Sequence, residues 1–266
     1  MSQNPYDQVR LTYIGGPTVL IEIGQLRFLT DPTFELAGYH YNAGPQVVSK
    51  TASPAILAST LGPVDAILLS HDQHTDNLDP AGRAYLEQGK QVLTTPAGAQ
   101  RLGGNAYGVP TWGTANLKDA NGLDVRVTAT PARHGPEEVK AATGDVNGWI
   151  LEWEGQRRGA LYISGDTVLF EGLEEIARRY RIGIALLHLG AARGQRFGPA
   201  HLTFTGAEAA QFARMLGEAA TIIPIHYDGW THYTEGRDGI EQAFTAAGLE
   251  KQLRFLPFGQ AVSIDI

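Results

Sequence analysis

Histidine and aspartate residues directly follow four apolar, strand-like runs of this sequence. Within four residues of the ends of these runs come His71, His134, Asp166 and His226. Strand ends in a layered fold can meet at one rim, whereas side chains inside the strands point into the core or away from it. We therefore expect these side chains to meet in space. Imidazole and carboxylate groups, in a chain with no cysteine, suit Zn, Mn or Fe(II) at a hydrolytic centre. The sequence thus predicts a metal site.

The segment after the first run contains further candidate ligands. His74 and Asp76 are two residues apart, so in an extended turn they can face the same side. His71 precedes His74 by three residues, so the chain must turn for the two imidazoles to lie side by side. Asp72 is the rival ligand at that corner. Spacing alone leaves both His71 and Asp72 open.

Strands and helices that position these residues follow from the apolar periodicity. We expect strands over 9–14, 18–23, 26–30, 64–70, 91–94, 124–130, 148–153, 159–164, 183–188, 220–226, 253–256 and 262–266. Helices are expected over 80–88, 171–181, 205–216 and 240–247, the first opened by Asp79 as N-cap before Pro80. Two mixed sheets stacked face to face with helices outside satisfy this order, although periodicity also allows other α/β arrangements. Residues 38–54 look irregular and are expected to form a mobile loop, in which Tyr39, His40 and Tyr41 are a candidate lid.

Composition and charge narrow the classes of partner. Lys and Arg total 21 and Asp and Glu total 28, a formal net charge of −7. Such a charge repels nucleic acids and anionic membranes. The first residues show no signal-peptide pattern, and no apolar run reaches the roughly 20 residues needed to cross a bilayer. We expect a cytoplasmic protein with a small-molecule substrate, without nucleic-acid or membrane partners, and with homo-oligomers as an open option.

Five short motifs occur along the chain in a fixed order. They are Leu29-Thr30-Asp31-Pro32, the segment His71-Asp72-Gln73-His74-Thr75-Asp76-Asn77, His134, Ser164-Gly165-Asp166-Thr167 and Pro224-Ile225-His226-Tyr227. This series resembles the metallo-β-lactamase-fold superfamily of metal-dependent hydrolases, whose signature is H-x-H-x-D-H. Within it, the chain is most similar to the lactonase-like branch related to ascorbate-6-phosphate lactonase and N-acyl-phosphatidylethanolamine phospholipase D. Two departures stand out: one residue is inserted between the first two histidines, and Asn77 replaces the last one.

The resemblance implies a single domain over residues 1–266, a four-layer αββα sandwich with two mixed β-sheets flanked by helices. It also implies two adjacent metal sites, formed by His71 (or Asp72), His74 and His134, and by Asp76, Asn77 and His226, with Asp166 bridging. We expect one or two divalent ions, zinc first and manganese or iron as alternatives. An amide oxygen is a poorer ligand than imidazole for a borderline metal. The second site is therefore vacant, weak or adapted to a harder ion, and Asn77 could instead form a hydrogen bond behind the ligands.

The expected function is hydrolysis of an ester, lactone or phosphodiester of a small substrate by a metal-activated water. Asp76 would orient that water and accept its proton, a role that the resemblance supports. His201 and His232 are assigned to the substrate side, with an exposed loop position as the alternative for His232. Arg133 and Arg193 are candidate anion anchors, and His188 is expected to be a hydrogen-bonded residue behind the site. Two other functions remain open: a metal-binding or ligand-sensing protein with degraded catalysis, which Asn77 favours, and di-iron reduction of oxygen or nitric oxide.

Overall fold

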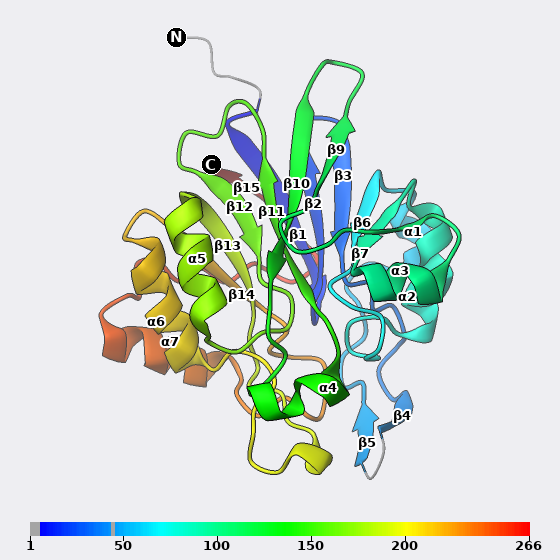
Figure 1. Cartoon of the computed structure of the whole chain (residues 1–266), viewed down its shortest axis with the longest axis vertical. Helices are drawn as coiled ribbons and strands as arrows, with labels where there is room; N and C mark the ends of the chain where they lie inside the picture. Colours follow the sequence, from blue (N-terminus) through cyan, green and yellow to red (C-terminus); the bar gives the residue numbers. More distant parts are fainter. Residues whose placement is uncertain (1–5, 44–45) are drawn as a thin grey trace.

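Two mixed β-sheets face each other in the computed structural model, which describes residues 6–43 and 46–266 (Figure 1). Over these residues the first sheet has seven strands in the order β15-β1-β2-β3-β6-β7-β8, and the second has six in the order β14-β13-β12-β11-β10-β9. The first comprises β1 (Gln8–Gly15), β2 (Thr18–Ile23), β3 (Leu26–Thr30), β6 (Ala66–Leu68), β7 (Val92–Thr94), β8 (Ala106–Gly108) and β15 (Ala261–Asp265). The second comprises β9 (Thr114–Lys118), β10 (Asp124–Pro131), β11 (Asn147–Glu152), β12 (Ala160–Ile163), β13 (Ile182–His188) and β14 (Thr221–Ile225).

Helices cover the outer face of each sheet, which gives four layers. On the seven-stranded sheet lie α1 (Ala58–Leu61), α2 (Pro80–Tyr85) and α3 (Pro96–Leu102), and on the six-stranded sheet lie α5 (Glu171–Arg179), α6 (Gly206–Leu216) and α7 (Arg237–Ala247). Leu11 and Phe28 of one sheet pack with Val125 and Trp149 of the other in the core between the sheets. Successive side chains along these strands point alternately into this core and toward the helix-covered face. The predicted αββα sandwich is confirmed.

Side-chain caps begin two of the predicted helices. The Asp79 carboxylate accepts a hydrogen bond from the backbone N of Gly82 at 2.7 Å, and Pro80 follows it. Thr205 and Glu208 form a reciprocal capping box at the start of α6. Both patterns satisfy backbone N–H groups that would otherwise have no partner in the first helical turn.

The structure differs from the expected elements in several segments. α1, α3, β8 and β9 form where the sequence pattern predicted no element. Residues 253–256 form no strand: only Leu253 makes an isolated bridge, to Ile222. From there the chain passes to the other sheet, where Phe258 makes an isolated bridge to Tyr13 of β1. Residues 38–54 contain a hairpin of β4 (His40–Ala43) and β5 (Gln46–Ser49) in place of a wholly irregular loop. Its tip, residues 44–45, lies outside the described residues, as do residues 1–5.

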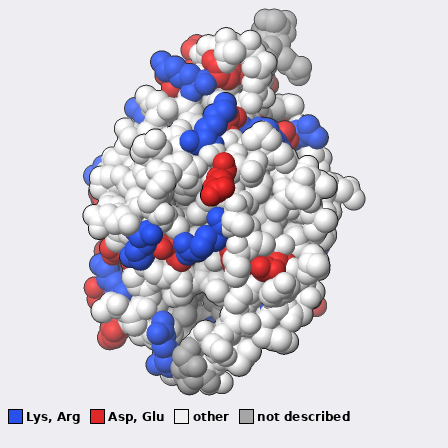
Figure 2. Space-filling view, turned by 90° about the vertical axis from the view of Figure 1, so that its right-hand side faces the viewer, with Lys and Arg blue, Asp and Glu red and all other residues white. Residues whose placement is uncertain are grey.

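One edge of the sandwich, the lower edge in Figure 1, carries the loops that follow β6, β10, β12 and β14. The β4–β5 hairpin and α4 (Lys140–Thr143) lie at the same edge. On the face shown in Figure 2, Lys and Arg side chains are separated and interspersed with Asp and Glu, and they form no continuous basic surface among the described residues. In the part of the chain that the structure describes, no helix is long and apolar enough to span a bilayer.

Candidate metal centre

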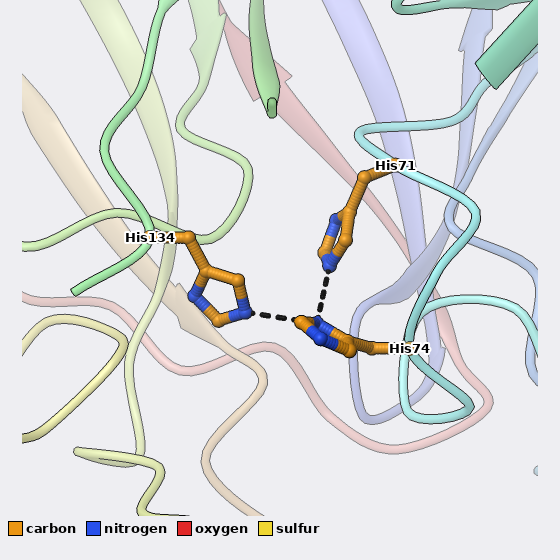
Figure 3. A group of neighbouring side chains, drawn as sticks. All are labelled: His71, His74 and His134. Carbon is orange, nitrogen blue, oxygen red and sulfur yellow. Dashed lines mark hydrogen bonds between the residues drawn. The ribbon is translucent and has the colours of Figure 1, made fainter. Parts of the chain in front are cut away.

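Three histidines converge at this edge from two sheets. His71 and His74 lie on the loop after β6, and His134 follows β10 (Figure 3). Their candidate ligand nitrogens all lie within 4.8 Å of one another. Nδ1 of His74 is 2.9 Å from Nε2 of His71 and 3.0 Å from Nε2 of His134. The three rings therefore present nitrogens to one point.

Hydrogen bonds on the far side of the rings hold this arrangement. Nδ1 of His71 is 2.9 Å from Oγ of Ser70, and Nδ1 of His134 is 2.8 Å from the backbone oxygen of Leu202. Each bond leaves Nε2 of its ring turned inward. Ligand histidines in metalloproteins are commonly fixed in this way by a partner on the other nitrogen.

A second group, Asp76, Asp166 and His226, lies beside the first, with its ligand atoms also within 4.8 Å of one another. Nε2 of His226 is 3.2 Å from Oδ2 of Asp76 and 3.6 Å from Oδ1 of Asp166. The other oxygen of Asp166, Oδ2, is 3.6 Å from Nε2 of His134. Asp166 therefore lies between the two groups, with one oxygen facing each.

The backbone places these residues by tight turns at strand ends. Asp166 follows β12 through Gly165, whose φ of +59° lies in the left-handed region. A Cβ atom at Gly165 would come within 2.5 Å of the backbone oxygen of Asn147, so only glycine fits there. His226 itself has a φ of +60°, an uncommon conformation for a residue with a side chain. Such backbone strain concentrates at functional sites.

Burial and neighbouring charges shift the histidine pKa values in opposite directions in the two groups. Burial lowers the pKa of both His71 and His74, and repulsion between adjacent imidazolium charges adds to this effect; together they bring the pKa of His74 to about 4. Burial alone would raise the pKa of Asp76, but His232 and His226 outweigh it and hold that pKa well below its usual value. Conversely, Asp166 and Asp76 outweigh burial and raise the pKa of His226 to about 9.

The donor set fits divalent cations. The first group offers three imidazoles, and the second offers two carboxylates and an imidazole, a set without thiolate that suits Zn, Mn or Fe. Among the described residues, Oδ2 of Asp166 and Nε2 of His226 are buried without a hydrogen-bond partner. Buried polar atoms of this kind are rare unless a water or an ion completes them. The two groups therefore provide the ligand types that two adjacent cation sites require.

Asp72, the alternative to His71, faces elsewhere. Its carboxylate accepts hydrogen bonds from Arg101, at 2.9 Å from Nε and 2.5 Å from Nη2. This bidentate pair holds Asp72 against α3, and the three-histidine group contains His71.

Asn77 contacts the second group through its amide nitrogen. Nδ2 is 3.2 Å from Oδ1 of Asp166 and 3.4 Å from Oδ2 of Asp31, while Oδ1 is buried without a partner among the described residues. Two carboxylate oxygens around Nδ2 require the donor end of the amide there. Asn77 thus supports Asp166 by a hydrogen bond.

A cavity of about 220 Å³ opens onto both groups. Its walls include Val48 of the β4–β5 hairpin and Arg196 and Phe197 of the loop after β13, as well as His74, Asp76 and His232 nearer the ligands. The hairpin is held in place by Lys50, whose Nζ lies 3.0 Å from Oδ2 of Asp79, both side chains being buried. Apolar periodicity predicted neither that the β4–β5 hairpin forms a wall of this cavity nor that Arg196 lines it. The only sequence signal near Arg196 is a second arginine, Arg193, three residues before it.

Two of the remaining candidate residues line this cavity, and three do not. His232 lines it, whereas His201 is outside the described lining and bonds Oε2 of Glu208 at 3.0 Å. Arg193 lines the cavity, and Arg133 instead pairs with Glu171 at 3.5 Å. His40 is exposed and bonds Ser49 at 2.7 Å.

Comparisons with known proteins agree with this architecture. Residues 26–227 match the family model of the beta-lactamase superfamily domain. A UPF0173 metal-dependent hydrolase of Pyrococcus furiosus is 29% identical over 223 residues, which cover 84% of this chain and 86% of that protein. Among solved structures, the isothiocyanate hydrolase from Delia radicum gut bacteria superposes with a TM-score of 0.79 at 21% identity, covering 97% of this chain and 100% of that one. A metallo hydrolase from Ignicoccus hospitalis gives a TM-score of 0.67 at 23% identity, covering 97% and 99% of the two chains. The chain belongs to the beta-lactamase superfamily, as its motif order predicts.

Proposed function

We propose that this protein is a metal-dependent hydrolase that cleaves an ester, lactone or phosphodiester of a small substrate with a metal-activated water. The observation that carries the proposal is the pair of adjacent ligand groups with Asp166 between them. His71, His74 and His134 would hold one divalent ion, Asp76 and His226 the other, and Asp166 both. Bound ions of this kind lower the pKa of water toward neutrality and polarise the oxygen of the scissile bond.

Asp76 is the residue that we assign to orient the attacking water and accept its proton. It lines the cavity, and its Oδ2 atom lies 2.8 Å from Nε2 of His232 and 3.2 Å from Nε2 of His226. These two imidazoles flank the carboxylate and keep its pKa low, so it is ionised at neutral pH and its oxygens can receive a hydrogen bond from the water.

The cavity favours a small substrate that carries a negative charge. Arg193 and Arg196 line it, and within the described part of the chain Asp76 supplies the only carboxylate in the lining. The charge of Arg196 also contributes to the low pKa of His74, after burial and His134, so this guanidinium acts on the ligand groups themselves. A volume of about 220 Å³ fits a small molecule better than a polymer. The interspersed charges on the face in Figure 2 and the net charge of −7 also disfavour a nucleic acid.

A second candidate is a metal-binding or ligand-sensing protein with degraded catalysis. Asn77 favours it, because this residue bonds Asp166 through its amide nitrogen at the position where the superfamily motif has a histidine. The two candidates agree on metal binding and differ in turnover.

Metal content and hydrolysis, measured on the same preparation, test the proposal. We expect two ions per chain by plasma mass spectrometry and turnover of either bis(p-nitrophenyl) phosphate or a member of a lactone panel. His134→Ala and Asp166→Ala should each abolish turnover and lower the metal content, whereas His40→Ala, in the exposed hairpin, should change neither. Metal binding without turnover of any ester, lactone or phosphodiester would favour the binding protein.

A further inference from the structure

His232 lies against the second ligand group from a loop that the superfamily motifs do not include. We infer that His232 is a fourth protein ligand of the second cation site and supplies the imidazole that Asn77 does not. The inference rests on the proposed function, because it assumes that Asp76, Asp166 and His226 bind an ion.

His232 contacts the second group through Asp76, although it is not among the residues whose ligand atoms all lie within 4.8 Å of one another there. Nε2 of His232 is 2.8 Å from Oδ2 of Asp76, and that same oxygen is 3.2 Å from Nε2 of His226. In the first group, Nδ1 of His74 likewise lies between two ring nitrogens, at 2.9 and 3.0 Å. In both groups one central atom is thus flanked by two imidazole nitrogens that approach it closely.

Asn77 supplies no ligand atom to the second site. Its amide nitrogen faces Asp31 and Asp166, which makes it a donor to carboxylates. Asp76, Asp166 and His226 alone provide three protein ligands, and zinc in proteins is commonly held by three or four. His232 raises the set to four and restores a second imidazole.

The loop that carries His232 is fixed at several points. The backbone oxygen of His232 accepts a hydrogen bond from the backbone N of Arg193 at 3.0 Å, and the backbone N of Thr231 donates to the oxygen of Ser49 at 3.0 Å. The imidazole is 9% exposed and lies between the rings of Tyr233 and Trp230, with centroid distances of 4.6 and 6.2 Å. Nδ1 is buried and has no hydrogen-bond partner among the described residues. Packing therefore presents Nε2 to the second group without help from a bond on Nδ1.

Metal titration of His232 variants tests this assignment. Wild-type protein, freed of metal and reloaded with Zn²⁺, should bind two ions per chain. His232→Ala should retain one ion and bind the second more than about 100-fold more weakly, measured by competition with a chromophoric chelator. A loss of only about 10–100-fold is what removal of a hydrogen-bond partner behind a ligand costs, and it would overturn the assignment as a ligand. His201→Ala is the matched control: it removes a nearby histidine that bonds Glu208, and it should retain both ions.

A double variant guards against a merely structural effect. Asn77→His combined with His232→Ala returns an imidazole to the motif position and should recover binding of the second ion. Retention of both ions at wild-type affinity in His232→Ala would overturn the inference alone, as would simultaneous loss of both ions, which would mean that His232 supports the whole site. A wild-type protein that binds fewer than two ions would overturn the proposed function as well.

Discussion

Asp31 and His188 connect the two sheets beneath the metal centre, each at the end of an interior strand. Oδ2 of Asp31 is 3.0 Å from Nε2 of His188, and both side chains are buried. Asp31 follows β3 of the seven-stranded sheet, and His188 is the last residue of β13 in the six-stranded sheet. The other oxygen of Asp31 accepts a hydrogen bond from the backbone N of Ser70 at 2.6 Å, directly before His71. The packing of the sheets is thereby connected to the loop that carries the first ligands.

Replacing His188 with alanine should destabilise the protein strongly. The change removes the imidazole partner of the buried Asp31 carboxylate, and losing a hydrogen bond to a charged group costs about 1.5–3 kcal/mol. His188→Gln keeps a side-chain donor and should cost less. Urea unfolding of the metal-free proteins measures both free energies, and a loss below about 1 kcal/mol in His188→Ala would contradict a supporting role for the pair.

The sequence predicts the fold well where a segment's structure depends on its own residues. The helix expected over 205–216 matches α6, and the apolar runs correspond to the central strands. Residues 253–256 also form an apolar run, but the chain passes there from one sheet to the other, and only Leu253 pairs, by an isolated bridge. Local periodicity contains no information about where a sheet ends.

The choice between His71 and Asp72 shows the same limit within the site. Both residues follow the strand, and their spacing from His74 leaves either one open. The structure distinguishes them because Arg101, 29 residues further along, binds the Asp72 carboxylate. His188 is hydrogen-bonded behind the site, as predicted, although its partner Asp31 lies 157 residues away. Long-range partners of this kind can be named only once the fold is known.

Asp72→Asn should leave the metal content unchanged. The substitution removes a charge that pairs with Arg101 and lies away from the three-histidine group, so we expect a loss of about 1 kcal/mol in stability and no loss of an ion. His71→Ala should instead lower the metal content by one ion. Metal analysis of the two purified variants checks this, and loss of an ion in Asp72→Asn alone would reverse the assignment.

Arg196→Ala should weaken binding of anionic substrates. Loss of one guanidinium contact at the partly exposed cavity mouth should raise KM about fivefold to tenfold, which corresponds to about 1 kcal/mol. A neutral lactone or ester of the same size should show no change in KM. Arg237→Ala, which removes an exposed arginine paired with Glu241 on α7, is the control. An equal effect of Arg196→Ala on charged and neutral substrates would argue against charge recognition.

The His201–Glu208 pair predicts a pH-dependent contribution to stability. The hydrogen bond that His201 donates to Glu208 raises the pKa of His201, and the same bond helps to lower the pKa of Glu208 against the effect of burial. The histidine part is fully present below its unfolded pKa of about 6.5 and is lost as the pH rises through the raised folded value. The glutamate part is present above its unfolded pKa of about 4.3 and is lost as the pH falls through the lowered folded value.

His201→Ala should therefore cost more stability near pH 6 than near pH 9. The pair is partly exposed, so the difference should be at most about 1 kcal/mol. Denaturant unfolding at both pH values measures it, and an equal cost at pH 6 and pH 9 would show that the ion pair contributes nothing.

Anomalous X-ray scattering from crystals grown with Zn²⁺ or Mn²⁺ tests the central claim most directly. Data collected on both sides of the metal absorption edge locate and identify each ion. We predict two peaks per chain, one among His71, His74 and His134 and one among Asp76, Asp166 and His226, with Asp166 contacting both. Anomalous maps that show no peak in either group, at saturating metal concentration, would contradict the account.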